Sequence, residues 1–338
     1  MMRRRRLWVG LAATLLFCFL LVRGLDPNQV RQAWQTADYR WVAPALVAFF
    51  AGVWFRALRW RVILASTVEV PTRRLWGFLA IGYLANNVLP ARLGDLARAY
   101  LVGRETGVSK ALVLGTVFVE RLADVFALLV LILLAALLVP LEDWFVQILR
   151  AGAGLFVLGF LAVIVLSLSR RRTLVLLAIA LRVVPPRFHQ PALKLADSFL
   201  NGLASVRGAH QVLGVAVLSL AAWLAEATMY WIMLIAFQQS FPFSVAMLTT
   251  AVANLGLAVP SSPGGIGPFE FAAAETLKLF GATGEVATAY AVALHLVLLA
   301  PVNLLGLIYL WGWQISLRRL VESSARTATG EEVAPTQP

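Results

Sequence analysis

The chain has 338 residues, of which 60% are hydrophobic and 14% are charged. Soluble domains carry about 25% charged residues, so this composition excludes an ordinary soluble protein and indicates a polytopic membrane protein. The net charge is +12, but the arginines cluster between apolar runs. We therefore interpret them as determinants of membrane orientation and not as a nucleic-acid surface. With Cys18 as the single cysteine, an internal disulfide and a cysteine metal site are both excluded.

Six apolar runs predict full membrane spans. The first follows the basic start MMRRRR and is interpreted as an uncleaved span, because no small-residue cleavage site follows it. Residues 170–210 mix basic and apolar side chains around Pro185-Pro186, which predicts interfacial helices on the cytoplasmic face. We expect a single transmembrane domain over 1–318 and a disordered cytoplasmic tail over 319–338. The six runs are 7–22, 42–64, 111–139, 151–169, 211–238 and 286–313.

Two further segments, 75–104 and 244–281, are apolar but interrupted. When the N-terminus is placed in the cytoplasm, the positive-inside rule puts most basic residues on that side, Arg56 and Arg59 among them. Both ends of the first segment are then cytoplasmic, whereas both ends of the second lie outside. The sequence therefore predicts two re-entrant helical hairpins that enter from opposite faces, about eight hydrophobic segments in all.

The breaks in these two segments predict where the hairpin tips lie. The second break is AVPSSPGGIGPFEF at 258–271, rich in proline and glycine, and the first is NNVLPARLGD at 86–95. Broken backbone at membrane depth must be buried in protein or line a cavity, so we expect the tips to meet near the midplane. Gly107 precedes Arg121 by the same interval as Gly281 precedes His295, which indicates an inverted repeat with halves at about 42–139 and 211–313.

Charged side chains inside a membrane are costly and are often functional. The motif VERLAD places Glu120, Arg121 and Asp124 in the third span, with the two carboxylates four residues apart on one helix face. They are either an internal ion pair that fixes helix packing or intramembrane polar and proton-relay residues. Glu226 has no nearby cation in sequence, so it must pair with another span, be protonated or face water. It is also a candidate proton-relay residue.

The hairpin tips supply the predicted substrate-binding residues. The guanidinium of Arg92 or Arg98 can bind a lipid phosphate through two parallel hydrogen bonds. The positive-inside rule alone would also explain why arginines occur at these two positions. In the second tip, Pro268 opens a helix whose N–H groups suit an anion, unless Glu270 satisfies that helix end itself. We interpret His295 as a hydrogen-bonded packing residue. The predicted set is Asn86, Asn87, Arg92, Asp95, Arg98, Gly264, Gly265, Gly267 and Glu270.

Three motifs, NNVLPARLGDLARAYLV, VERLAD and VPSSPGGIGPFE, occur in this order. Together they resemble the lysylphosphatidylglycerol synthase transmembrane region, also called the flippase-like or UPF0104 family, over about residues 10–318. The resemblance implies a lipid-translocating role, because a similar module in the bacterial multiple peptide resistance factor moves aminoacylated phosphatidylglycerol between leaflets. Those proteins carry a C-terminal soluble aminoacyltransferase domain. This chain ends about twenty residues after its last predicted span, so synthase activity is not expected.

We therefore predict a lipid translocator of a bacterial-type inner membrane, with both termini cytoplasmic, that moves a phospholipid or a polyprenyl-phosphate-linked lipid. The expected partners are anionic or phosphate-bearing lipids, with a homo-oligomer or a lipid-synthesis enzyme as further candidates; no nucleic acid, metal or cofactor is expected. The chain has no P-loop, so ATP is not the expected direct energy source. Two alternatives stay open. One is a membrane-embedded enzyme that uses intramembrane carboxylates as acid and base. The other is an accessory subunit of lipid-linked glycan or aminoacyl-lipid synthesis.

Overall fold

The computed structural model is helical throughout the part of the chain that it describes. It describes residues 2–89, 93–139, 170–181, 189–206, 208–259 and 261–315, with a few single positions between 147 and 159. No strand occurs among these residues, which confirms the prediction of an all-α protein. Most of the predicted span 151–169, the whole tail 319–338 and Arg92 lie outside the described residues.

Four long helices have the length and the apolar composition to cross a bilayer. They are α3 (Val42–Leu64, preceded by the short η1 at Tyr39–Trp41), α6 (Lys110–Leu138), α10 (Ala209–Ala236) and α13 (Gly284–Gly312). Each coincides with a predicted run, because a long apolar segment satisfies its backbone hydrogen bonds within one helix. These four helices make the chain a multi-pass membrane protein.

The first predicted span has a different form. Helix α1 (Met2–Val22) is followed after a short break by α2 (Pro27–Thr36), and the two helices are bent by 84°. Asp26 accepts a hydrogen bond from the Asn28 N–H, and Pro27 occupies the first turn of α2. Counted together, the bent pair gives a fifth candidate span. The described residues thus hold four or five candidate spans, whereas the sequence predicts six for the whole chain.

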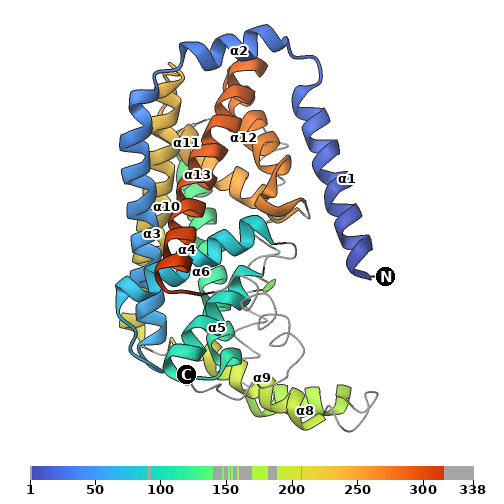
Figure 1. The fold of residues 1–338 in the computed structure, drawn as a ribbon, viewed down its shortest axis with the longest axis vertical. Helices are drawn as coiled ribbons and strands as arrows, with labels where there is room; N and C mark the ends of the chain where they lie inside the picture. The colour runs from blue at the N-terminus through green and yellow to red at the C-terminus, as the bar shows by residue number, and fades with distance from the viewer. Residues whose placement is uncertain are drawn as a thin grey trace.

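Short helices fill the two interrupted segments. Between α3 and α6 lie α4 (Thr72–Val88) and α5 (Gly94–Thr106). Between α10 and α13 lie α11 (Phe243–Gly256), the short η5 (Pro263–Gly265) and α12 (Pro268–Leu279). The order long, short, short, long therefore occurs twice along the chain (Figure 1).

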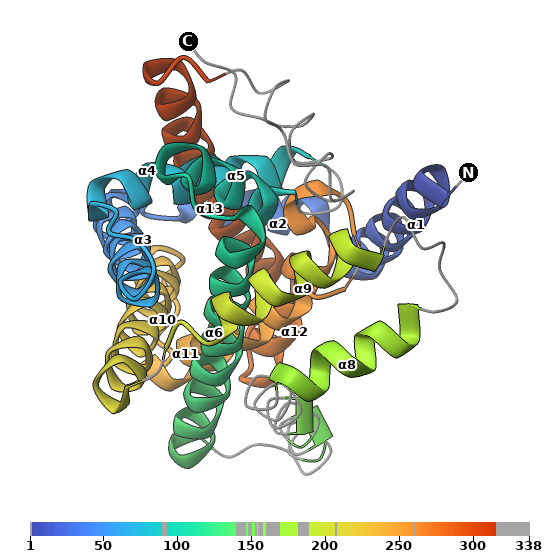
Figure 2. The same ribbon diagram turned by 90° about the horizontal axis from the view of Figure 1, so that it is seen from below.

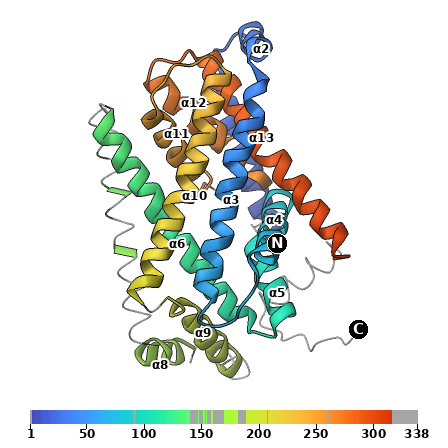
Figure 3. The ribbon, with the colours of Figure 1, turned by 90° about the vertical axis from the view of Figure 1, so that its left-hand side faces the viewer.

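Each pair of short helices starts and ends at the same end of the bundle, and the two pairs belong to opposite ends (Figures 1 and 3). The chain between α3 and α4 lies beside α9 (His189–Leu203), where the Ser66 hydroxyl donates to the Ser205 carbonyl at 2.8 Å. The chain between α10 and α11 lies beside α2, where the Gln238 amide donates to the Thr36 carbonyl at 2.9 Å. Helices α4 and α5 therefore belong to the α9 end, and α11 and α12 belong to the α2 end.

Helix α9 fixes the start of α6 at its end of the bundle (Figure 2). The backbone of Gly202 in α9 lies against Gly115 and the carbonyl of Leu112 in α6, so closely that neither glycine leaves room for a side chain. Helices α8 (Arg170–Ala180) and α9 both lie within residues 170–210, the stretch for which the sequence predicts interfacial helices.

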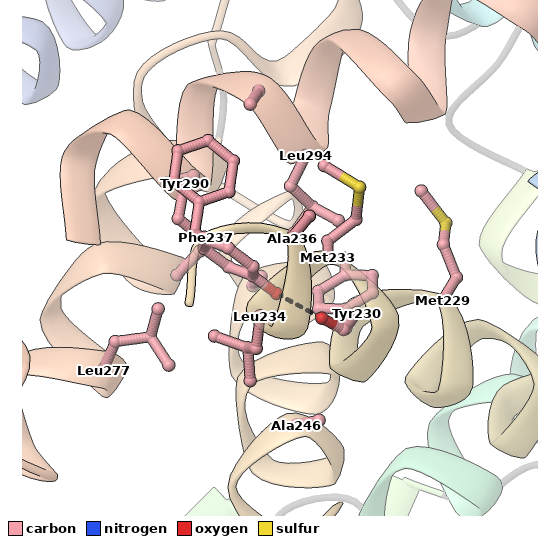
Figure 4. Close-up of a cluster of buried hydrophobic side chains, with 14 of the residues drawn as sticks. Met229, Tyr230, Met233, Leu234, Ala236, Phe237, Ala246, Leu277, Tyr290 and Leu294 are labelled. Atoms are coloured by element: carbon pink, nitrogen blue, oxygen red, sulfur yellow. Dashed lines mark hydrogen bonds between the residues drawn. The ribbon is translucent and has the colours of Figure 1, made fainter. Parts of the chain in front are cut away.

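A buried aromatic and aliphatic cluster joins the helices of the second half (Figure 4). The Tyr290 hydroxyl of α13 donates to the Tyr230 carbonyl of α10 at 3.0 Å, and the ring of Phe237 stands edge-on to Tyr290. A buried tyrosine needs a partner for its hydroxyl, so this contact sets how α10 and α13 are rotated against each other.

Candidate functional site

Charged side chains gather inside the bundle, where α3, α5, α6 and α10 meet. Glu120 and Asp124 of α6 both point inward from one helix face and are 2% and 7% exposed. Arg59 of α3 reaches both of them, with Nη1 at 2.6 Å from Asp124 Oδ1 and Nη2 at 3.6 Å from Glu120 Oε1. The acidic residues of VERLAD are therefore paired with a cation from another long helix.

Arg98 of α5 brings the first pair of short helices into this network. Its Nη1 lies 2.9 Å from Glu120 Oε2, and its Nη2 lies 2.8 Å from Asp95 Oδ1. The indole of Trp60 lies 4.9 Å from the guanidinium, and Arg98 is 3% exposed. The Arg98 guanidinium, which the sequence analysis considered as a binder of lipid phosphate, is thus paired with two protein carboxylates in this structure.

Arg121 forms the exposed end of the network. Its Nη2 lies 2.8 Å from Asp95 Oδ1, and its Nη1 lies 3.5 Å from Asp124 Oδ2. The Arg121 side chain is 45% exposed and that of Asp95 is 30% exposed, whereas the other carboxylates are buried. The ion-pair alternative for VERLAD therefore describes the observed contacts.

A further ion pair joins Arg56 of α3 to Glu226 of α10, with Nη2 and Oε2 2.5 Å apart. Of the three options for Glu226, pairing with another span is the one observed. The ring of Trp223 lies 4.6 Å from the Arg56 guanidinium, and its indole N–H donates to Asp124 Oδ1 at 3.0 Å. Trp223 thus connects this pair with the rest of the network.

Arg56 and Arg59 correct the sequence analysis, which assigned both to the cytoplasmic side by the positive-inside rule. They are 7% and 1% exposed and lie within the bundle. A signal was present, because both arginines fall inside the apolar run 42–64, three residues apart and so on one helix face. Charges within an apolar run face protein or water and find partners there.

The network is electrically balanced and joins both interrupted segments. It contains four arginines, Arg56, Arg59, Arg98 and Arg121, and four carboxylates, Asp95, Glu120, Asp124 and Glu226. Helix α5 contributes Asp95 and Arg98, while Asn254 of α11 donates to Glu226 Oε1 at 3.1 Å. Buried charges of opposite sign offset part of each other's desolvation cost, so this balance favours the burial of six of the eight charges, while Asp95 and Arg121 remain partly exposed.

The tip of the first short-helix pair is held by two asparagines. Asn86 Oδ1 accepts a hydrogen bond from the Gly94 N–H at 2.7 Å, which ties α4 to the start of α5. The Asn87 amide donates to Asn303 Oδ1 of α13 at 2.9 Å. Arg92 lies outside the described residues, so its predicted role stays a prediction.

The tip of the second pair depends on glycine. Gly264, Gly265 and Gly267 have φ of 80°, 77° and 100°, a region that side chains disfavour. Glu270 Oε2 accepts from the Gly267 N–H at 2.7 Å, while Oε1 lies 2.6 Å from His295 Nδ1. Glu270 therefore satisfies its own helix end, and His295 is a hydrogen-bonded packing residue.

The two tips meet. Helix α4 packs against η5, and a methyl group added to Gly264 would lie 3.7 Å from the Asn87 carbonyl oxygen. The predicted residues Asn87 and Gly264 are thus neighbours, although 177 positions separate them in the sequence. The described residues contain no group of three or more His, Cys, Asp and Glu arranged to hold a metal ion.

The family model of the lysylphosphatidylglycerol synthase TM region matches residues 7–306. The chain belongs to this family. It is 28% identical to "Glycosyltransferase AglD" of Haloferax volcanii, over 97% of this chain and 58% of that protein. It is 26% identical to a "UPF0104 membrane protein" of Methanothermobacter thermautotrophicus, over 88% of this chain and 91% of that protein. A third relative, "UPF0104 membrane protein MJ1078" of Methanocaldococcus jannaschii, is 26% identical over 57% of this chain and 79% of that protein.

This membership confirms the resemblance carried by the three motifs. The lysylphosphatidylglycerol synthase TM family match includes all four long helices and both short-helix pairs almost completely. The chain spans about three-fifths of the length of AglD, but most of the length of the first UPF0104 relative.

Proposed function

We propose that this protein moves a phosphate-bearing lipid between the two leaflets of a bacterial-type inner membrane. The observation that carries the proposal is the meeting of the two short-helix tips, from opposite ends of the bundle, beside a buried and balanced charge network. Opposed broken helices of this kind form the central substrate site in several transporter families. In this proposal both pairs are re-entrant hairpins, the residues 151–169 complete six spans, and the termini are cytoplasmic.

The lipid headgroup would bind at the two tips. Asn86, Asn87 and Arg92 would approach it from the first tip, and the turn at 264–268 would approach it from the second. Gly265 matters here because its φ of 77° favours glycine and a side chain there would displace Leu257, so a substitution would change the shape of the turn.

The charge network would control which tip is open. Its α5 residues move with the first hairpin, and the Asn254 contact moves with the second. A movement of one hairpin would therefore change contacts within the same network that also holds the other hairpin. The inverted halves 42–139 and 211–313 would exchange roles as the site faces first one leaflet and then the other.

A second candidate function comes from AglD, whose name is that of a glycosyltransferase. This chain aligns with 58% of that protein. A membrane module that holds a lipid-linked substrate for a glycosyltransferase would also need a headgroup site, but it would not need to pass the headgroup across the bilayer. Leaflet exchange separates the two functions.

The test uses purified protein in liposomes that contain fluorescent lipids of several headgroup classes, with leaflet exchange followed by quenching from outside. We expect exchange of at least one phosphate-bearing lipid well above the rate of empty liposomes. Exchange at the rate of empty liposomes for every class would overturn the proposal, and a new glycan or aminoacyl lipid product would favour an enzyme.

A matched pair of glycine variants tests the role of the tip. Gly265→Leu places a side chain against Leu257 at φ 77°, whereas Gly107→Leu imposes a similar backbone cost at φ 74° with nothing within 4 Å. We expect Gly265→Leu to abolish exchange and Gly107→Leu to retain it. Equal exchange by both variants would show that the tip does not contact the lipid.

A further inference from the structure

The carboxylates of the charge network differ in how many cations they face. Asp95 pairs with Arg98 and Arg121, Glu120 pairs with Arg59 and Arg98, and Asp124 pairs with Arg59 and Arg121. Among the described residues, Glu226 pairs with Arg56 alone, and Arg56 pairs with Glu226 alone. This ion pair is therefore the one that can open without breaking any other.

The second oxygen of Glu226 is also weakly held. Its donor is the Asn254 amide, which lies 3.1 Å from Glu226 Oε1, 3.1 Å from the Tyr230 hydroxyl and 2.9 Å from the Thr250 carbonyl. An amide nitrogen carries two hydrogens, so three acceptors compete for two donors. Glu226 therefore has one cation and one shared amide as its partners, whereas each of the other three carboxylates pairs with two arginines.

Charge balance limits what can enter such a site. The four arginines and four carboxylates sum to zero, and an added anionic phosphate would leave one uncompensated charge in an apolar bundle. Uncompensated charge in such surroundings is strongly unfavourable. Uptake of one proton by a carboxylate restores neutrality, and the carboxylate with the fewest cations loses the least by accepting it.

We propose that Arg56 exchanges Glu226 for the phosphate of an anionic lipid while Glu226 takes up one proton, so that each lipid moves together with one proton. This inference rests on the proposed function. In the exchange, the Glu226 carboxylate gains H⁺ and becomes a neutral acid, and no covalent bond to the lipid forms or breaks. The Arg56 guanidinium stays protonated and pairs with a phosphate oxygen, so the net charge of the site is the same before and after.

The surroundings of the pair fit this exchange. Arg56 belongs to α3. Glu226 and Tyr230 both belong to α10, and Tyr230 lies within electrostatic range of the pair. Asn254 faces it from α11, and Tyr83 of α4 and Asp124 of α6 lie within electrostatic range of Arg56. None of these is a second cation for Glu226. A protonated Glu226 is also a poorer acceptor for Asn254, so the same proton loosens the link to the second hairpin.

The experiment imposes a pH difference across the membrane of proteoliposomes and measures the equilibrium distribution of lipid between leaflets. The probe is fluorescent phosphatidylglycerol, with fluorescent phosphatidylethanolamine as a net-neutral comparison. Coupling to one proton predicts that one pH unit shifts the leaflet ratio of the anionic lipid up to about tenfold toward the alkaline side. The net-neutral lipid should not shift. A protonophore should remove the shift by dissipating the gradient.

Glu226→Gln removes the titratable group, so a variant that still exchanges the anionic lipid should leave its leaflet ratio unshifted; a shift that persists in this variant would overturn the inference. Glu275→Gln, in an exposed pair with Lys278, is the matched control and should retain the shift. Anionic lipid exchange with an unshifted ratio in the wild-type protein would overturn the inference and leave the proposed function standing. An equal shift of the net-neutral lipid would also overturn it. Absence of exchange for every lipid would instead overturn the proposed function.

Discussion

The Thr14 hydroxyl accepts a hydrogen bond from the backbone N–H of Ser262 at 2.9 Å, and it donates one to the Ile266 carbonyl at 3.0 Å. One side chain of α1 thus spans the turn before α12. Close by, the backbone of Gly10 lies against the Ser261 carbonyl, and the ring of Phe17 stands edge-on to Phe271. The first helix is therefore part of the second tip, although about 250 positions separate them.

Replacing Thr14 tests this contact. Thr14→Val keeps the shape of the side chain but loses both hydrogen bonds, each with a net value of about 1 kcal/mol. We expect local opening of residues 261–267 to become about 30-fold more frequent, measured by hydrogen–deuterium exchange. Thr36→Val is the control, because the Thr36 hydroxyl bonds only within its own helix at Gln32 and Ala33. Unchanged protection of the tip in Thr14→Val would contradict the prediction.

The Arg56–Glu226 pair should show strong energetic coupling. Either Arg56→Met or Glu226→Met leaves a buried charge without its partner and should cost about 3–5 kcal/mol of unfolding free energy. The double variant removes both charges and should cost much less than the sum of the two. Thermal or denaturant unfolding in detergent measures this cycle. Additive losses would mean that the two side chains do not stabilise each other.

Close backbone packing of α9 on α6 should tolerate no side chain at its centre. Gly202→Leu forces a side chain into the Leu112 carbonyl and the Gly115 backbone. We expect a loss of about 1–3 kcal/mol and faster hydrogen exchange throughout α9. Gly312→Leu, at a helical glycine with nothing within 4 Å, should change neither quantity. A stable Gly202→Leu variant with a protected α9 would contradict the prediction, because it would show that the contact accommodates a side chain without loss of stability.

Glu270 contacts the Gly267 N–H and His295 Nδ1, and two substitutions of Glu270 should show whether these contacts need its charge or only its hydrogen-bonding groups. Glu270→Gln can keep both contacts, because its amide oxygen accepts from Gly267 and its NH₂ group donates to His295 Nδ1. Glu270→Ala loses the helix cap and the buried hydrogen bond together and should cost about 2 kcal/mol or more. The melting temperatures of Glu270→Gln and Glu270→Ala, each compared with that of the unmodified protein, test this expectation. Equal losses would indicate that the contact needs an ionised carboxylate.

Part of the fold follows from local sequence. The runs 42–64, 111–139, 211–238 and 286–313 were predicted as spans, and each is a long helix. The breaks in the two interrupted segments were also predicted, since proline removes a backbone donor and glycine at positive φ ends regular helix. The bend between α1 and α2 was missed, although Asp26 and Pro27 are a typical helix start.

The pairing of charges did not follow from local sequence. Arg56 and Arg59 were assigned to the cytoplasm because, with the N-terminus inside, the second half of the run 42–64 leads to the cytoplasmic face, where the positive-inside rule expects arginines. Their partners, Glu226 and Asp124, are 170 and 65 positions away. Similarly, nothing near Thr14 in the sequence indicates that its hydroxyl binds residues 262 and 266.

Local sequence was sufficient to predict the four long helices and the breaks in the two interrupted segments, because hydropathy, proline and glycine act on backbone within a few residues of themselves. Only the packing of the helices shows which charges meet, that Glu226 pairs with one arginine among the described residues, and that the tips at Asn87 and Gly264 touch. These relationships depend on how separate helices are rotated and shifted against one another. That arrangement is set by packing between distant segments, such as Gly115 on Gly202 and Tyr290 on Tyr230.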